Sequence, residues 1–205
     1  ATEILTQAKV EEWIVGDGLS FIHDMDVASN GKFYGTDEGH DILWELDPET
    51  NVVTKHHLPD IDLPRGGLFS GLNLAIGIFT GKHGPHSMAE TTDGRIWITN
   101  ALSSTIMSFD PDTHEFKSYD VPGDALYPHT IRVDKNDVLW FTIVASNQMG
   151  RFDPKTEDMS VIGLPHNGYW RWVSDMLFPT ILRLSSWKEG SVWMLDFTHH
   201  RFLGY

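Results

Sequence analysis

The chain has 205 residues, of which 40% are hydrophobic and 12% aromatic, which is enough to bury the core of a folded domain and argues against disorder. Its formal net charge of −14 would repel phosphate backbones and anionic membrane surfaces, so nucleic acid is not expected as a partner. The absence of cysteine excludes disulfides and thiolate metal sites, and no apolar run approaches the roughly 20 residues that a membrane-spanning helix needs.

The N-terminal segment is predicted to contain one edge β-strand, within residues 7–16. This strand includes the run VEEWIV, and Trp13 precedes His23 by ten residues, just as Tyr119 precedes His129. The segment therefore matches the last strand of a repeated unit. The first residue is Ala1 rather than Met, which fits either a removed signal peptide or a shortened chain. With the first alternative, the expected location is periplasmic or secreted.

A unit of 43 residues, the spacing from His86 to His129, recurs along the chain and has the length of four short strands with their turns. Each copy has a histidine near its start, an aromatic residue eleven positions later and an Asp-Pro pair 24 positions after the histidine. The copies span residues 22–60, 85–124 and 128–167. Their histidines are His23, His86 and His129, their aromatic residues are Tyr34, Trp97 and Trp140, and their Asp-Pro pairs begin at Asp47, Asp110 and Asp153.

Alternation and turn chemistry predict the strands inside each copy. The second strands are FYGT, IWIT and LWFT, whose β-branched and aromatic residues suit a pleated surface, and their aromatic rings are expected to pack between neighbouring units. An Asp-Pro-x-Thr turn then joins the third strand to the fourth. The predicted third strands are 42–47, 106–110 and 149–153, and the predicted fourth strands are 52–58, 116–121 and 159–164.

Two stretches, residues 61–84 and 168–187, break the period. The first is expected to be a loop over one face, and the second contains FPTILRL, which could be the first strand of a last unit without its histidine. That partial unit, residues 178–205, places Trp193 in its second strand and lacks a fourth strand. Residues 7–16 would supply the missing strand and remove two exposed edges. The prediction is an all-β protein, a β-propeller with about four visible blades that forms one domain over residues 1–205.

The repeat resembles that of the streptogramin lyase family, also called virginiamycin B lyase-like propellers. The shared pattern is Pro-His-x-Ile, then Asp-Gly-x-Ile/Leu-Trp-Phe/Ile-Thr, then Ile-x-x-Phe-Asp-Pro-x-Thr, over roughly residues 10–60 and 85–165. The resemblance implies a ring of six or seven blades, of which this chain could be a fragment. It also implies a magnesium-dependent lyase that opens a macrocyclic ester by β-elimination, with carboxylates and histidines at the mouth of the central channel. The glutamate of the lyase blades corresponds here to Asp37, Asn100, Ile143 and Asp196, with Glu38 one step from the first.

The site is predicted at one mouth of the channel, because the first strand of a blade starts there and the second strand ends there. Imidazoles and carboxylates that converge from separate blades suit acid–base catalysis or a divalent cation, here Mg²⁺ or Ca²⁺. A histidine near its unperturbed pKa of about 6.5 would remove the proton. The candidate catalytic residues are His23, His86 and His129, and the candidate metal ligands are Asp37, Glu38, His40, Asp196 and His199.

The repeated histidines also allow other interpretations. A repeated histidine is often structural, for instance by bonding the backbone of the next blade, and a ring of imidazoles could also hold copper or iron. His56 and His57 lie on a predicted outer strand and are not counted as candidates.

The partner is expected to be a small or cyclic organic molecule that undergoes elimination or hydrolysis at the mouth. The competing hypothesis is a non-catalytic propeller that binds a protein or assembles through residues 61–84 and the Trp170-Arg171-Trp172 segment, since aromatic residues and Arg are enriched at interface hot spots.

Overall fold

The computed structural model describes residues 10–71 and 80–164, together with the backbone of strands within 182–188, 191–196 and 201–204. It contains three four-stranded antiparallel sheets and one three-stranded sheet, each with its strands in chain order. The all-β propeller architecture predicted from the repeat is confirmed. Blade 1 consists of β1 (Ile22–Val27), β2 (Phe33–Asp37), β3 (Ile42–Asp47) and β4 (Val52–His57).

The remaining sheets repeat this order. Blade 2 consists of β5 (Pro85–Glu90), β6 (Ile96–Asn100), β7 (Thr105–Phe109) and β8 (Phe116–Asp120). Blade 3 consists of β9 (Pro128–Val133), β10 (Leu139–Ile143), β11 (Gln148–Asp153) and β12 (Asp158–Gly163). Blade 4 consists of β13 (Leu182–Lys188), β14 (Ser191–Asp196) and β15 (Arg201–Gly204). The predicted second, third and fourth strands of the three full blades agree with these bounds to within about one residue.

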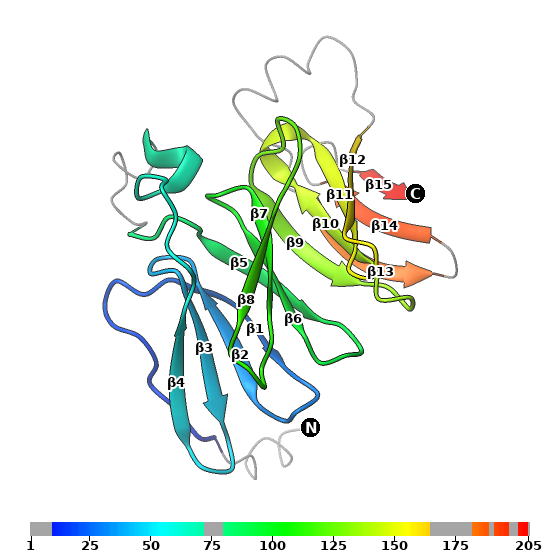
Figure 1. Cartoon of the computed structure of the whole chain (residues 1–205). Helices are drawn as coiled ribbons and strands as arrows, with labels where there is room; N and C mark the ends of the chain where they lie inside the picture. The colour runs from blue at the N-terminus through cyan, green and yellow to red at the C-terminus, as the bar shows by residue number, and fades with distance from the viewer. Residues whose placement is uncertain (1–9, 72–79, 165–181, 189–190, 197–200, 205) are drawn as a thin grey trace, which may run out of the picture.

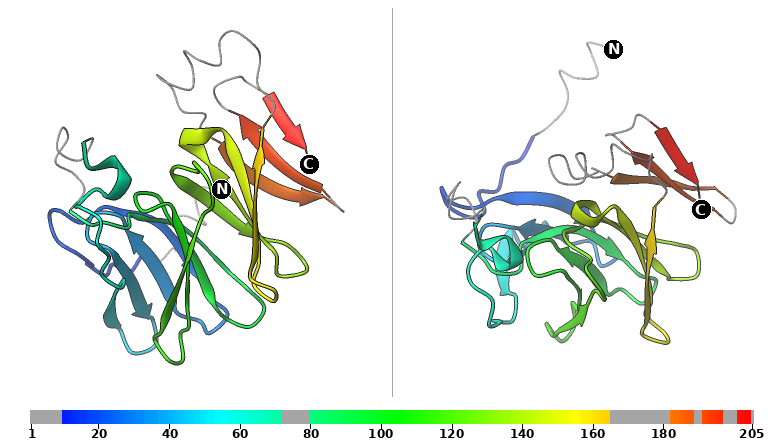
Figure 2. Two further views of the ribbon diagram at one scale, coloured as in Figure 1. Left: turned by 45° about the horizontal axis from the view of Figure 1, so that its top comes forward. Right: turned by 90° about the horizontal axis from the view of Figure 1, so that it is seen from above.

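The sheets fan out around a common axis (Figure 1), with β1 beside β5, β5 beside β9 and β9 beside β13. The first strand of each blade is therefore the inner one. Blades 1 and 4 lie at opposite ends of an arc, and the described residues do not close a ring (Figure 2). Two short 3₁₀ turns, η1 (Gly67–Phe69) and η2 (Val144–Ser146), lie between strands. Within the described ranges, no helix is long and apolar enough to cross a membrane.

Apolar side chains fill the spaces between the blades, as the aromatic positions of the repeat predict. Tyr34 of β2 lies against Phe109 of β7, with ring centroids 6.1 Å apart, and Trp97 of β6 takes the same place against Phe152 of β11 at 5.4 Å. Both rings thus pack on the next blade. The expected inter-blade role is confirmed for Trp97 and stays a prediction for Trp140 and Trp193. Blade-to-blade burial of this kind is the main source of hydrophobic stabilisation in the fold.

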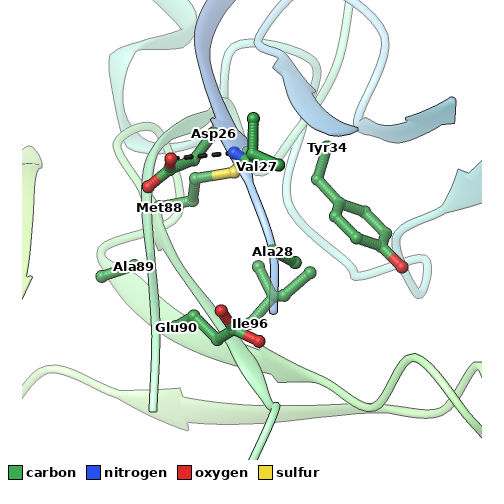
Figure 3. A pocket seen from close by; sticks show the side chains of 8 residues that line it. All are labelled: Asp26, Val27, Ala28, Tyr34, Met88, Ala89, Glu90 and Ile96. Atoms are coloured by element: carbon green, nitrogen blue, oxygen red, sulfur yellow. Dashed lines mark hydrogen bonds between the residues drawn. The ribbon is translucent and has the colours of Figure 1, made fainter. Parts of the chain in front are cut away.

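A small gap remains between blades 1 and 2, at the end of the strands away from the repeated histidines. It has a volume of about 10 Å³ and lies between β1 and β5 (Figure 3). That space holds at most one water molecule, so we do not regard it as a ligand site. It is lined by Asp26, Val27, Ala28, Tyr34, Met88, Ala89, Glu90 and Ile96.

The N-terminal segment differs from the prediction that it completes the last blade. Residues 7–9 lie outside the described ranges, residues 10–16 form no strand, and blade 4 contains only β13, β14 and β15 among the described residues. Instead, the Trp13 indole donates a hydrogen bond to Asn51 Oδ1 at 2.9 Å. Trp13 and Val15 also line a cavity of about 310 Å³ against the outer face of blade 1. The physical reason is that none of the described blades covers this apolar face, and the segment packs on it.

The last blade starts as the sequence suggested. β13 begins at Leu182, eleven residues before Trp193, which is the position of the histidine in the other three blades. Leu182 pairs with Asp196 at the end of β14. The fourth blade therefore contributes no histidine at this place in the ring.

Candidate functional site at the channel mouth

Three imidazoles, one from each full blade, meet on the inner side of the arc. The ring centroids of His23 and His86 are 3.6 Å apart, those of His86 and His129 are 4.0 Å apart, and those of His23 and His129 are 6.2 Å apart. We call these three residues the histidine cluster. The predicted convergence follows from the register, because the start of each inner strand pairs with the end of the next strand: Ile22 with Asp37, Pro85 with Asn100, and Pro128 with Ile143.

A threonine in the second strand of each blade fixes the backbone beside each histidine. The ladder is irregular at this point in all three blades, and the Thr36, Thr99 and Thr142 hydroxyls accept hydrogen bonds from the N–H groups of Asp24, Ser87 and Thr130 at 3.1–3.2 Å. The hydroxyls of Thr36 and Thr99 also donate to the carbonyl oxygens of His86 and His129 in the next blade, at 2.8 and 2.5 Å. In these links the backbone of the histidine, rather than its imidazole, joins neighbouring blades.

His86 occupies the centre of the cluster and is only 3% exposed. Burial lowers its pKa to about 2, and repulsion from the neighbouring His129 and His23 acts in the same direction. Its Nδ1 atom is buried and has no hydrogen-bond partner in the described part of the chain. A buried nitrogen without a partner is costly, so this atom is a place where a polar ligand or a water molecule would bind.

A phenol lies beside the cluster and is hydrogen-bonded to a buried carboxylic acid. Glu38, 1% exposed, follows β2, and Tyr127 precedes β9 in blade 3; the Tyr127 hydroxyl donates to Glu38 Oε1 at 3.2 Å. The Tyr127 ring lies 5.8 Å from the ring of His86 and 6.1 Å from that of His129. Burial raises the pKa of Glu38 to about 7, although the hydrogen bond from Tyr127 opposes the shift. Glu38 can therefore exchange a proton near neutral pH.

Asp37 and His40 lie together in the turn after β2, as predicted, but Asp37 already has many partners. Its carboxylate accepts hydrogen bonds from Phe21 N, Gly39 N and Trp44 Nε1 at 2.9–3.2 Å, and His40 Nδ1 lies 3.3 Å away. Burial alone would raise the pKa of Asp37, but these hydrogen bonds hold it below its ordinary value. The carboxylate thus stabilises the turn and has little capacity left for a cation.

The other predicted ligands cannot be placed at the mouth. Asp196 is the last residue of β14, but its side chain lies outside the described residues, as does the whole of His199. Mg²⁺ and Ca²⁺ require several oxygen ligands. The described part of the mouth offers mainly imidazoles, together with an Asp37 carboxylate that already accepts several hydrogen bonds and a Glu38 carboxyl group bonded to Tyr127. These residues do not fit a hard cation.

Sequence reasoning missed two features. Tyr127 has a φ of 65° and occupies the place in blade 3 that Gly84, with a φ of 62°, occupies in blade 2. Little in the sequence signalled it, because this position, two residues before the histidine, holds Phe21, Gly84 and Tyr127 in the three blades. The second feature is a set of potential metal ligands away from the mouth, formed by Glu45, His56 and His114, whose ligand atoms lie within 4.8 Å of one another. The sequence did not indicate this set of ligands, because His56 lies on an outer strand and the sequence does not show that the next blade covers its side chain.

Comparison with solved structures supports the propeller fold. A catalytically inactive variant of virginiamycin B lyase from Staphylococcus aureus, crystallised with quinupristin, matches with a TM-score of 0.72 and 15% identity over 97% of this chain and 60% of that chain. A streptogramin B lyase structure matches with a TM-score of 0.63 and 22% identity over 88% of this chain and 53% of that chain. The WD40 repeats of RRP9 match with a TM-score of 0.56 and 10% identity over 93% of this chain and 52% of that chain.

These similarities show the fold alone. The chain spans between half and two thirds of the length of these three proteins. No protein-family model matches the chain, and neither does any curated protein. The similarity extends to WD40 propellers as well as lyases, so any activity has to be argued from the site itself.

Proposed function

We propose that the channel mouth binds a small organic ligand. Glu38 would act as the acid–base group that removes a proton from this ligand or adds one to it in an elimination or hydrolysis reaction. One observation supports this above the others: a buried carboxylic acid with a pKa near 7 is hydrogen-bonded to Tyr127, whose ring lies 5.8 Å from that of His86, an imidazole with a buried nitrogen that has no described partner. A group titrating near the working pH is the most effective general base. Glu38 suits this role better than His86, because an imidazole with a pKa of about 2 is a weak base.

The remaining groups would position the ligand. Neutral His86 can offer a hydrogen bond to an uncharged polar group, and Tyr127 can donate to a developing negative charge once the ligand displaces it from Glu38. Burial and the nearby Glu38 raise the pKa of Tyr127, so its hydroxyl keeps its proton. We propose no metal-dependent step, because the described residues do not gather the oxygen ligands that Mg²⁺ or Ca²⁺ requires.

Quinupristin is the first probe to test, because the similar S. aureus lyase was crystallised with it. We expect ring opening, detected by mass spectrometry, and a loss of at least about 100-fold in rate for Glu38→Gln, the typical contribution of general acid–base catalysis. His57→Ala, an exposed change on β4, is the control and should retain full activity. No product, together with no change in the imidazole NMR resonances on adding quinupristin, would refute the lyase form of the proposal.

A binding or assembly platform is the second candidate, favoured by the outer face of blade 1. Ile22, Met25 and Val27 of β1 are 40%, 63% and 51% exposed, beside the apolar cavity that Trp13 borders. Exposed apolar patches of this kind mark protein interaction sites. A mass by light scattering well above that of one chain would support this function.

A further inference from the structure

A second cluster of polar side chains lies between blades 1 and 2, on the outer strands. Glu45 of β3 and His56 of β4 belong to blade 1, and His114 belongs to the turn between β7 and β8 of blade 2. We call these residues the inter-blade cluster. Glu45 Oε2 and His56 Nε2 are 2.8 Å apart, and the rings of His56 and His114 have centroids 4.8 Å apart. All three potential ligand atoms lie within 4.8 Å of one another.

The surroundings hold these groups in place. Glu45 and His56 are buried, at 5% and 7% exposure. Lys32 Nζ lies 2.6 Å from Glu45 Oε1, which leaves Oε2 facing His56. Phe109 packs against His56 with centroids 4.7 Å apart and fixes its ring. His114 is exposed, which gives a cation access from solvent.

The repeat shows that packing alone does not require this set. At the interface of blades 2 and 3, the positions matching Glu45, His56 and His114 hold Ser108, Tyr119 and Glu157. There, the Tyr119 hydroxyl and Lys117 Nζ bond Glu157 at 3.3 and 2.5 Å, an ordinary polar contact between blades. Two imidazoles and a carboxylate therefore replace residues that would serve the same structural purpose without forming a ligand set.

We propose that the inter-blade cluster binds a borderline divalent transition metal such as Zn²⁺, which ties blade 1 to blade 2. Two imidazole nitrogens with one carboxylate oxygen form a donor set suited to Zn²⁺ and poorly suited to Mg²⁺ or Ca²⁺. Because the ligands come from both blades, binding requires the folded interface and stabilises it. This site is separate from the channel mouth and does not depend on the function proposed there.

Zn²⁺ titration of chelator-treated protein by calorimetry tests the site. We expect His114→Ala to remove one equivalent of Zn²⁺ or to weaken its binding at least tenfold, since even second-shell changes cost 10–100-fold. His114 is exposed, so this substitution should preserve the fold. His57→Ala, which alters the exposed histidine next to His56, should bind Zn²⁺ as the wild type does. His129→Ala should also retain this equivalent, which separates the inter-blade cluster from the histidine cluster.

Thermal unfolding provides an independent measurement. Zn²⁺ should raise the melting temperature of the wild type and of His57→Ala but not of His114→Ala, because only a ligand that prefers the folded state stabilises it. Equal Zn²⁺ binding and equal stabilisation in wild type and His114→Ala would overturn the proposal. Absence of Zn²⁺ binding by the wild type would overturn it as well, and would leave a hydrogen-bonded His–Glu pair that only packs the interface.

Discussion

Glu38 is a carboxylic acid that has lost nearly all contact with water, and its single described hydrogen bond comes from Tyr127. Burial of this kind penalises the charged form and raises the pKa to about 7. The folded protein therefore holds a proton on Glu38 at pH values where the unfolded chain, with an ordinary pKa of 4.5, has lost it. The stability of the fold must depend on pH through this one residue.

We predict that Glu38→Gln reduces the pH dependence of stability between about pH 4.5 and 7. In the wild type, the folded state binds more protons than the unfolded state in this window, so stability falls as pH rises, by about 3 kcal/mol for a shift of this size. Gln cannot ionise and should lack this loss. Urea unfolding at pH 4.5 and pH 8 measures the difference. Exposed Glu49→Gln should behave as the wild type does, and an unchanged pH slope in Glu38→Gln would contradict the prediction.

The sequence predicted those site residues that recur at the same position in each copy of the repeat. The histidine cluster could be predicted because the same offsets recur in three blades, and turns at fixed offsets define which end of a strand each histidine occupies. Tyr127 and the pairing of His56 with His114 could not, since both join blades through residues that differ between copies. How far a side chain reaches across an interface depends on packing, which a single repeat unit does not encode.

At the level of strands, the blades fill the same space with different pairs of residues. The facing positions in the second and third strands hold Gly35 and Trp44 in blade 1, Ile98 and Met107 in blade 2, and Phe141 and Gly150 in blade 3. A large residue faces a small one, or two medium residues share the space. The repeat therefore accepts different residues at either position, provided that two bulky aromatic side chains do not face each other.

We predict that Gly150→Ala destabilises the fold by about 1–3 kcal/mol, the typical cost of overpacking a core. A Cβ at position 150 would lie 2.1 Å from the ring of Phe141, which is fully buried and cannot move aside. Gly163→Ala in the adjacent strand β12 is the matched control, because a Cβ there meets no atom within 4 Å. Chemical denaturation of both variants tests the argument, which fails if the two lose equal stability.

The elements themselves follow the sequence closely within the three full blades, because strong β-formers and Asp-Pro turns set their ends. The exception is the N-terminal segment. It was predicted to be a fourth strand, but residues 10–16 form no strand, and Trp13 and Val15 line a cavity against blade 1 instead. A strand needs an available edge at the right distance, and that condition depends on how the blades are arranged.

At the scale of the whole molecule, no blade among the described residues covers one apolar face of blade 1. The N-terminal segment covers part of it, with Trp13 and Val15, but Ile22, Met25 and Val27 remain substantially exposed. In the interior of the arc, the equivalent faces are buried against the next blade. This face is therefore the surface on which the proposed contact with another protein chain would be tested.

We predict that Met25→Gln lowers the binding of a neutral hydrophobic dye such as Nile red and shifts any assembly toward the single chain. Met25 is 63% exposed, so a polar side chain there should reduce the apolar patch without disturbing the core. Val52→Gln, at a position 55% exposed on β4, is the control, because it removes an exposed apolar side chain that does not belong to this patch. Fluorescence titration and light scattering provide the measurements, and equal dye loss in both variants would count against a functional patch.

The threonine hydroxyls that hold the carbonyls of His86 and His129 have a further effect on how the protein could evolve. The backbones of His86 and His129 are thus held partly by the blade before them, so a substitution at Thr36 would remove the bond to the His86 carbonyl, 50 residues away, together with the bond from Asp24 N in its own sheet. Selection on the spacing of the imidazoles therefore acts on pairs of blades, and a blade exchanged between related propellers would transfer its histidine without the neighbour that aligns it.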